Sequence, residues 1–450
     1  MRIIPRTLNL WHKTLLLTLI GLPVVMYAFR TDNSIDVSEQ ISFLHQGEEP
    51  RTFEIDNKDS ADSLTTYLGK QLTSFLRQNG LRGGISVCIS RGGRLTFAKG
   101  FGYSDLADST VMQPYNVMRV ASVSKLITAV AVMRLVEEGK LSLDQRVFGP
   151  VGVLNDDVYS VFSDKRMRDI TVRQLLNHSG GWTTRYGDPM FMANTIEQYF
   201  GCGLPIDMED IIRYMQCKQL HFMPGSVSVY SNFGYGILGE VVAKAAGMPY
   251  ELYVQSHVFN PLGIFDAKLG YSHIEERLPD EVAYYEPDTA SRVPDYAEKG
   301  KLSRRAYGGS DIHTLGSAGG WVISTIDLTK LLLSIDGFAS VPDILSQSSI
   351  DEMTKRDVYF DPLGWRKVLE GGFWFRSGTL SATSAALGRR PDGICFAAVL
   401  NSSSGSLGPS LAIMLSNKMN EIINRIPYWP EYDLLENDEV WNSYKTLNKK

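Results

Sequence analysis

The sequence has few of the residues that bind metals or form redox centres. Its 450 residues include seven His and four Cys, and none of these stands in a CxxC or HExxH spacing. Those spacings are common signatures of zinc sites, so we expect neither a metal centre nor another cofactor. The sequence also lacks a basic tract interleaved with aromatic residues, and its net charge is −5. A nucleic-acid partner is therefore not expected.

Two common functional motifs are missing or incomplete. A G-x-S-x-G elbow occurs nowhere in the chain, which argues against an α/β-hydrolase with a Ser-His-Asp triad. Residues 234–239, GYGILG, formally satisfy G-x-G-x-x-G. A dinucleotide-binding fold needs a second strand about 20 residues later, but residues 249–259 are instead predicted to form a helix. We expect these glycines to serve close packing of helices.

The first thirty residues have the layout of an export signal. Basic residues precede a run without charge at residues 14–29, which is somewhat shorter than the ~20 residues that span a bilayer comfortably. Ala28 fits the −1 position of a cleavage site but Met26 is a poor −3 residue, so a retained anchor is favoured over a cleaved peptide. The rest of the chain would then lie on the periplasmic or extracellular face of the cytoplasmic membrane, anchored or secreted. A buried helix of the folded domain is the alternative.

Disulfides are permitted in that compartment, but the sequence does not require them. Cys202 and Cys217 are close enough in sequence to close a loop, whereas Cys88 and Cys395 stand in strand-like runs and could simply be buried. Spacing alone decides neither bond.

After the N-terminal segment (residues 1–30) the chain divides into a spacer, one domain and a tail. Residues 31–59 are polar and aperiodic, as a spacer would be. The domain extends over residues 60–425 and includes a loop-rich helical lobe at about 145–310. The tail, residues 426–450, is acidic and aromatic, and we favour a strap packed on the domain over a partner-binding tail.

Hydrophobic periodicity predicts strands near both ends of this domain and helices between them. The predicted strands are residues 84–90, 95–102, 372–378, 382–389 and 393–401, and the predicted helices outside the lobe are 60–78, 122–138, 326–336 and 408–425. This order predicts an α+β fold, an α/β sandwich with one antiparallel sheet built from both chain ends and flanked by helices, and an inserted all-helical lobe. A cleft beside the lobe is the natural place for chemistry.

The first candidate site motif is Ser122-x-x-Lys125, the only Ser-x-x-Lys in the chain. On a helix these two positions share a face, so the lysine can reach the serine hydroxyl. A serine needs a neighbouring base to become a nucleophile, and a buried lysine has its pKa lowered toward that role. The helix N-terminus adds a positive dipole near the serine. The alternative is a capping serine beside an ordinary surface lysine.

The second motif is Tyr230-Ser231-Asn232, the only Tyr-x-Asn in the chain. A phenol near an ammonium can be partly ionised and act as a second acid or base. The amide of Asn232 can orient the lysine or hold a substrate amide. Turn formation is the alternative.

The third motif, Arg376-Ser377-Gly378-Thr379, lies on a predicted strand. An arginine at a strand edge can bind a substrate carboxylate bidentately. The glycine would let the substrate approach the backbone closely. The alternative is an exposed arginine at a strand end.

The order and neighbours of these three motifs resemble the serine β-lactamase and penicillin-binding-protein superfamily, most closely its class C, D,D-carboxypeptidase and esterase branch. The resemblance covers about residues 62–424 and includes the connecting stretches 170–181, 230–239, 260–264 and 317–321. It implies a β-lactamase/transpeptidase-like fold and an acylated serine, with Lys125 and Tyr230 sharing proton transfer. It also implies that the backbone N–H groups of Ser122 and Thr379 bind the oxyanion.

The third motif departs from the family pattern, which usually has Lys or His where this sequence has Arg376. Arginine stays charged, so it can bind a carboxylate but cannot move protons. We therefore expect Arg376 to recognise a substrate anion.

These features together predict an exported serine hydrolase that acts through an acyl-enzyme on an amide, ester or lactam, as a β-lactamase, D,D-carboxypeptidase or esterase does. Its partners would be the cytoplasmic membrane, through the N-terminus, and a small-molecule or peptide substrate, such as one that carries a carboxylate. The alternative is a non-hydrolytic penicillin-recognising sensor or scaffold of the same fold. Because every nucleophilic group is present, we favour the enzyme.

Overall fold

The computed structural model describes residues 50–60, 63–403 and 407–447. These belong to the larger of two compact units, His45–Lys450. The expected export segment, residues 1–30, and residues 31–49 of the expected spacer lie outside the described residues. No helix among the described residues is long and apolar enough to cross a membrane.

Within the described residues, seven strands form one antiparallel sheet in the order β3-β2-β1-β12-β11-β10-β9. The strands are β1 Gly84–Arg91, β2 Arg94–Asp105, β3 Thr110–Val111, β9 Lys367–Val368, β10 Trp374–Leu380, β11 Thr383–Arg389 and β12 Ile394–Leu400. The two chain ends meet where β1 pairs with β12, in a register that places Ile85 opposite Leu400. The prediction of one antiparallel sheet built from both ends of the domain is therefore confirmed.

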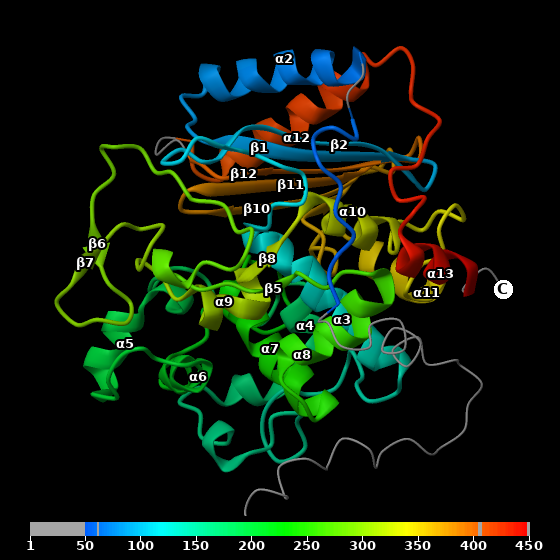
Figure 1. Cartoon of the computed structure of the whole chain (residues 1–450). Helices are drawn as coiled ribbons and strands as arrows, with labels where there is room; N and C mark the ends of the chain where they lie inside the picture. The colour runs from blue at the N-terminus through cyan, green and yellow to red at the C-terminus, as the bar shows by residue number, and fades with distance from the viewer. Residues whose placement is uncertain (1–49, 61–62, 404–406, 448–450) are drawn as a thin grey trace, which may run out of the picture. The chain divides into compact units, whose positions relative to one another are not determined.

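Helices cover both faces of the sheet. Helices α2 (Ser63–Gln78) and α12 (Ser410–Ile423) pack on one face, and α10 (Thr325–Leu333) packs on the other (Figure 1). Leucines spaced four residues apart on α2 are buried in one core cluster with apolar residues of β1, β2 and β12. Because both faces are covered, β1 and β12 are buried along almost their whole length, which explains their nearly continuous apolar sequences.

Helices are the main regular structure of the segment between the two halves of the sheet, but long irregular stretches join them, so it is not the all-helical lobe that the sequence predicted. It contains α4 Val172–Leu176, α5 Ala193–Phe200, α6 Met208–Gln216, α7 Asn232–Ala246, α8 Tyr250–Val254 and α9 Ile312–Gly319. It also contains three two-residue strands, β5 Lys268–Leu269, β6 Val293–Pro294 and β7 Leu302–Ser303. Strand β5 joins β8 (Trp321–Ile323) and β4 (Met118–Arg119) in a small sheet that the sequence pattern did not predict.

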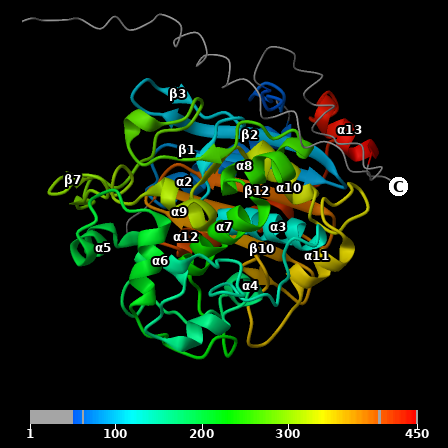
Figure 2. The same cartoon turned by 90° about the horizontal axis from the view of Figure 1, so that it is seen from below.

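Helix α3 (Ser124–Glu137) is the central helix of this arrangement. Eleven of its fourteen residues are buried, so it has no wide solvent-facing stripe. It packs against α7 and α9, and α3 and α7 lie side by side in the view from below (Figure 2). The fold therefore places the first residues of α3 inside the protein, between the sheet and the helical lobe.

The glycines of residues 234–239 serve packing rather than dinucleotide binding. Residues 227–229, which would have to be a strand, are irregular, and α7 begins directly after its capping residue Ser231. A Cβ atom at Gly239 would lie 2.5 Å from Ser317 Oγ, so only glycine allows α7 and α9 to approach this closely.

All four cysteines fall within the described ranges, and each is a free thiol. Cys88 and Cys395 are buried, while Cys202 and Cys217 are exposed and do not close a loop.

Candidate active site

Ser122 lies in a 3-10 turn, Ala121–Val123, immediately before α3. The sequence predicted that Ser122 opens the helix itself, but α3 begins two residues later. Ala121 has φ of +50°, a left-handed conformation that is strained for a residue with a Cβ atom. The turn presents the serine at the N-terminal end of α3, where the helix dipole is positive.

Lys125 points from the first turn of α3 toward the serine and is completely buried. Its Nζ lies 3.3 Å from Ser122 Oγ and donates to Asn232 Oδ1 at 2.7 Å and to the carbonyl of Ala318. Burial lowers the pKa of Lys125, and the nearby charge of Arg376 lowers it further. The lysine therefore has both the position and the lowered proton affinity that a base for Ser122 needs.

Tyr230 comes from the loop before α7, and its hydroxyl donates to Ser122 Oγ at 2.7 Å. Burial by itself would raise the pKa of this phenol, but the positive charges of Lys125 and Arg376 outweigh that effect and lower its pKa to about 8. A fraction of the phenol can thus be ionised near neutral pH, so Tyr230 is a second group that can take or return a proton.

The amide of Asn232 is occupied by two protein partners. Its Oδ1 accepts from Lys125, and its Nδ2 donates to Asp188 Oδ2 at 2.6 Å. Asp188 also accepts from the backbone N–H of Met190 at 3.1 Å and thereby anchors the turn that follows it. Of the two roles expected for Asn232, the structure shows the one that orients the lysine, while the donor expected to hold a substrate amide is bonded to Asp188.

Arg376 differs from the expected exposed arginine. It is only 1% exposed, although β9 pairs only with Trp374 and Phe375 of β10, so that at Arg376 the strand is paired with β11 alone. Its Nε donates to the carbonyl of Ser122 at 2.7 Å, and its Nη2 lies 3.4 Å from the hydroxyl of Tyr230. The guanidinium therefore contacts the catalytic segment itself rather than projecting into an open groove.

Gly378 allows a close backbone approach, but to the nucleophile segment instead of to a substrate. A Cβ atom there would lie 2.1 Å from the carbonyl oxygen of Val120 and 2.9 Å from the backbone N of Ser122. The absence of a side chain thus lets β10 pack directly against the turn that carries the serine. The next residue, Thr379, lines the same cavity as Ser122, as the expected pair of oxyanion donors requires.

A cavity of about 380 Å³ opens on the serine. Its walls include Ser122, Tyr230, Asn232, Ser377 and Thr379, together with Phe191, Leu315, Ala318, Gly319, Arg366, Leu380 and Pro409. Every predicted site residue either lines this cavity or hydrogen bonds to one that does, except Gly378, whose backbone packs behind it. Among the described residues, no cluster of three or more His, Cys, Asp or Glu side chains could hold a metal ion.

Three side chains of the site were not predicted. Asp188 and Arg366 lie in irregular segments, and the Arg366 guanidinium sits 5.5 Å from the ring centre of Tyr230. His178 packs its ring 4.6 Å from that of Tyr230 and accepts from the N–H of Ser231. Burial and the neighbouring positive charges hold the pKa of His178 well below its usual value, so it is a neutral support for the motif. His178 lies in a stretch that carried the family resemblance, which was the one available signal.

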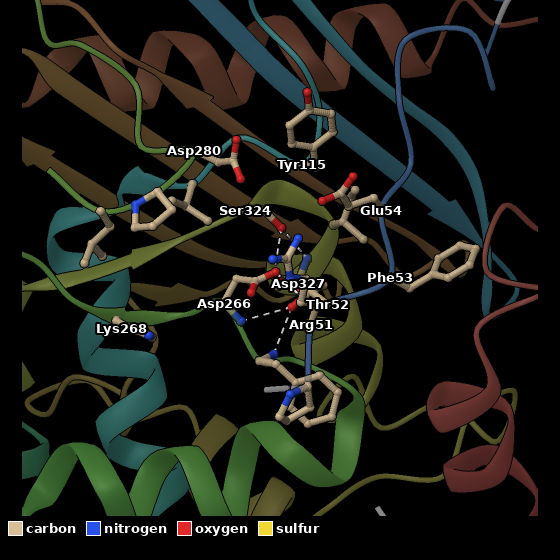
Figure 3. Close-up of a pocket in the computed structure, with 16 residues that line it drawn as sticks. Arg51, Thr52, Phe53, Glu54, Tyr115, Asp266, Lys268, Asp280, Ser324 and Asp327 are labelled. Carbon is tan, nitrogen blue, oxygen red and sulfur yellow. Dashed lines mark hydrogen bonds between the residues drawn. The ribbon is translucent and has the colours of Figure 1, made fainter. Parts of the chain in front are cut away.

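A second cavity, of about 770 Å³, is lined by residues 50–54 and by further residues, none of which lines the cavity around Ser122 (Figure 3). Four carboxylates face it, from Glu54, Asp266, Asp280 and Asp327. Its serine, Ser324, caps α10 by accepting from the N–H of Asp327, which is a structural role. We therefore place the chemistry in the cavity around Ser122.

Comparisons with known proteins agree with this geometry. A family model described as Beta-lactamase matches residues 70–425. PbpX of Bacillus subtilis, named as a penicillin-binding protein, is 26% identical over 376 residues, which are 82% of this chain and 80% of that protein. Esterase EstB of Burkholderia gladioli is 30% identical over 226 residues, 48% of this chain and 54% of the esterase.

Solved structures share the fold. D-amino acid amidase from Ochrobactrum anthropi SV3 superposes with a TM-score of 0.62 at 19% identity, over 81% of this chain and 98% of the amidase. A penicillin-binding protein homologue from Pyrococcus abyssi, which is octameric, superposes with a TM-score of 0.57 at 25% identity, over 80% of this chain and 77% of that one.

Proposed function

This chain belongs to the Beta-lactamase family, and from that membership we propose that it cleaves an ester, amide or lactam through an acyl-enzyme formed on Ser122. It is a serine hydrolase of that family. The observation that carries the proposal is that Ser122 Oγ lies 3.3 Å from Lys125 Nζ and 2.7 Å from the Tyr230 hydroxyl. The pKa values of both groups are lowered toward neutrality.

The reaction begins when the Lys125–Tyr230 pair takes the proton of Ser122 as Oγ bonds to the substrate carbonyl carbon. The N–H groups of Ser122 and Thr379 stabilise the negative charge that develops on the carbonyl oxygen. The bond to the leaving group then breaks, and the leaving group receives the proton through Tyr230. A water molecule then gives a proton to the same Lys125–Tyr230 pair as its oxygen bonds to the carbonyl carbon of the acyl-enzyme. The bond from that carbon to Ser122 Oγ breaks, the acid product leaves, and Oγ takes the proton back.

We assign recognition of a substrate anion to Arg366 instead of to Arg376. Arg366 lines the cavity and its side chain is 41% exposed, whereas Arg376 is buried and bonded to Ser122 and Tyr230. Its ion pair with Asp361 is long, at 3.7 Å, so the guanidinium can turn to a substrate carboxylate at little cost. The relatives named as an esterase and as a penicillin-binding protein support an acyl substrate without deciding which one.

Labelling with a fluorophosphonate and a fluorescent penicillin tests the proposal. Ser122→Ala should abolish labelling, and Lys125→Met, which keeps the volume but not the base, should slow acylation by about 10²–10⁴-fold. Lys140→Ala, a change at an exposed lysine just beyond α3, is the control and should label at the original rate. Labelling of Lys125→Met at that rate would refute the assigned base. A stable adduct without turnover on any ester, amide or lactam would indicate the sensor instead of the hydrolase.

We further propose that the chain is exported and anchored through residues 1–30, because basic residues there precede a run without charge. An alkaline-phosphatase-type reporter fused after residue 60 should be active outside the cytoplasm. A reporter that works only in the cytoplasm can be fused at the same residue for comparison. Activity of that cytoplasmic reporter, together with an inactive alkaline-phosphatase-type fusion, would overturn this placement.

A further inference from the structure

A third cavity, of about 510 Å³ and called the chamber below, adjoins the catalytic cavity around Ser122. It is built by the turn and helix start at residues 190–195, by α6, by β6, by the first turn of α9 and by the end of β10. Most of its wall is apolar, including Met190, Met192, Ile206, Ile211, Val293 and Ile312. Its volume is in the range that holds a small organic group.

Phe191 and Leu380 line both this chamber and the cavity around Ser122. Leu380 directly follows Thr379, one of the two proposed oxyanion donors. The chamber therefore continues from the point where the substrate carbonyl would lie. Phe191 is 41% exposed, so its side chain is accessible to a bound molecule.

Two of the three charged side chains of the chamber, those of Arg119 and Asp311, are committed to the protein. The guanidinium of Arg119 donates to the carbonyls of Ala306 and Tyr271, each at 2.6 Å, and lies 3.7 Å from Glu281. Asp311 caps α9 by accepting from the N–H of Thr314. The third charged residue of the lining, Arg305, is exposed. Because Arg119 and Asp311 already have partners, the hydrophobic effect is the main attraction that the rest of the wall offers.

The turn at residues 190–195, which forms part of the chamber wall, can adapt to the group that the chamber binds. Met190 and Met192 are flexible side chains that fit groups of different shape. Asp188 nevertheless holds the start of the turn through the N–H of Met190, and the same carboxylate accepts from the catalytic Asn232. The chamber wall and the catalytic groups thus share one anchor, which keeps the chamber in a fixed relation to Ser122.

We propose that this chamber binds a bulky apolar group of the substrate, an aryl group or an acyl chain of several carbons, while the scissile bond lies at Ser122. The inference rests on the proposed function and adds its substrate class. The enzyme then acts on amphiphilic substrates, with an apolar arm in the chamber and, where present, an anionic group at Arg366 on the catalytic cavity.

The test is kcat/KM on p-nitrophenyl esters whose acyl chains grow from two to about ten carbons. Each methylene buried in the chamber should raise kcat/KM about fourfold until the chamber is full. Ala193→Phe adds a ring at a half-buried chamber residue of α5 and should flatten this dependence. Gln198→Phe places the same ring on an exposed residue of α5 that does not line the chamber, and it should leave the dependence unchanged.

Val293→Phe, on β6, reports on the same chamber if Ala193→Phe does not fold. A flat chain-length dependence in the unmodified protein, or a dependence that both filling variants leave intact, would overturn the inference. Hydrolysis of the acetate ester that needs Ser122 would in that case leave the proposed function standing. Failure of the proposed function has a different signature, because neither labelling nor acetate hydrolysis would then depend on Ser122.

Discussion

Arg376 acts on the catalytic groups through fixed contacts and through its charge. Its Nε donates to the Ser122 carbonyl, and its Nη2 faces the Tyr230 hydroxyl. This charge contributes to the lowered pKa of both Tyr230 and Lys125. Because a guanidinium stays protonated, the effect is constant across the working pH range. Arg376 is on this view a positioning residue that tunes the base, and it has no need to move protons itself.

This role predicts a specific pH dependence. If deprotonation of the coupled Lys125–Tyr230 pair limits acylation, kcat/KM on a neutral ester should rise with pH through an apparent pKa of about 8 and then level off. Arg376→Met removes a positive charge that favours the phenolate, so the rise should move to higher pH by about 1 unit or more. Arg376→Lys keeps a charge there and should shift the rise less. Activity profiles from about pH 6 to about pH 10 measure the shift. A reduced rate with an unmoved midpoint would show that Arg376 only holds the Ser122 carbonyl.

At the scale of elements, the site depends on the packing of β10 against the turn before α3. Gly378 removes the one side chain that would separate the strand from Val120 and Ser122. Ala121, with φ of +50°, supplies the tight turn that aims the serine into the cavity. The strain at Ala121 is maintained because the segments around it are buried and paired, β4 with β8 and α3 with α7.

These elements also show how far the sequence could predict the structure. The strands β1, β11 and β12 and the helices α2 and α12 carry long periodic or apolar runs, so their positions could be predicted to within a few residues. Ser122 and Lys125 are three residues apart, and local helix geometry alone brings them together. Strands β4 and β8 have two and three residues, which is too short for a period to be recognised.

Arg366 and Asp188 could not be predicted because long-range packing alone brings them to the site. Both lie in irregular segments, and neither forms a motif with its sequence neighbours. The burial of Arg376 was missed for a related reason. The alternation of a strand shows that Arg376 shares a face with Gly378. Which residues cover that face follows only from the packing of the turn that carries Ser122 on β10. Sequence predicted which residues gather here better than it predicted what each one contacts.

At the scale of the whole domain, the C-terminal segment is packed into the structure as a strap. Leu435, Trp441 and Tyr444 are buried in the main core cluster, the last two on α13 (Glu439–Leu447). The Tyr444 hydroxyl donates to the carbonyl of Pro342 at 2.7 Å. The acidic residues of this segment were the reason to consider a partner-binding tail. One of them, Asp438, pairs instead with Lys330 of α10 inside the protein.

That ion pair allows the contribution of the strap to be measured. Lys330 Nζ lies 2.6 Å from Asp438 Oδ2, with the two side chains 0% and 4% exposed, and it also donates to the carbonyl of Gly263 at 2.9 Å. Removing one partner of a buried pair leaves the other charge without compensation, which typically costs about 3–5 kcal/mol. Asp438→Asn isolates this effect, because an asparagine can still cap α13 by accepting from the N–H of Trp441.

Asp438→Asn should therefore lower the free energy of unfolding, measured by urea denaturation, by about 3–5 kcal/mol. The matched control is Asp156→Asn in the pair with Lys244, whose atoms are 2.8 Å apart but whose side chains are 51% and 41% exposed. Solvent screens that pair, so its loss should cost less than about 1 kcal/mol. Equal costs for the two substitutions would mean that water reaches Lys330 and that the strap is not closed over α10. A large cost at Asp438 alone would establish the C-terminal segment as part of the folding unit, because a loosely attached tail could not bury that charge.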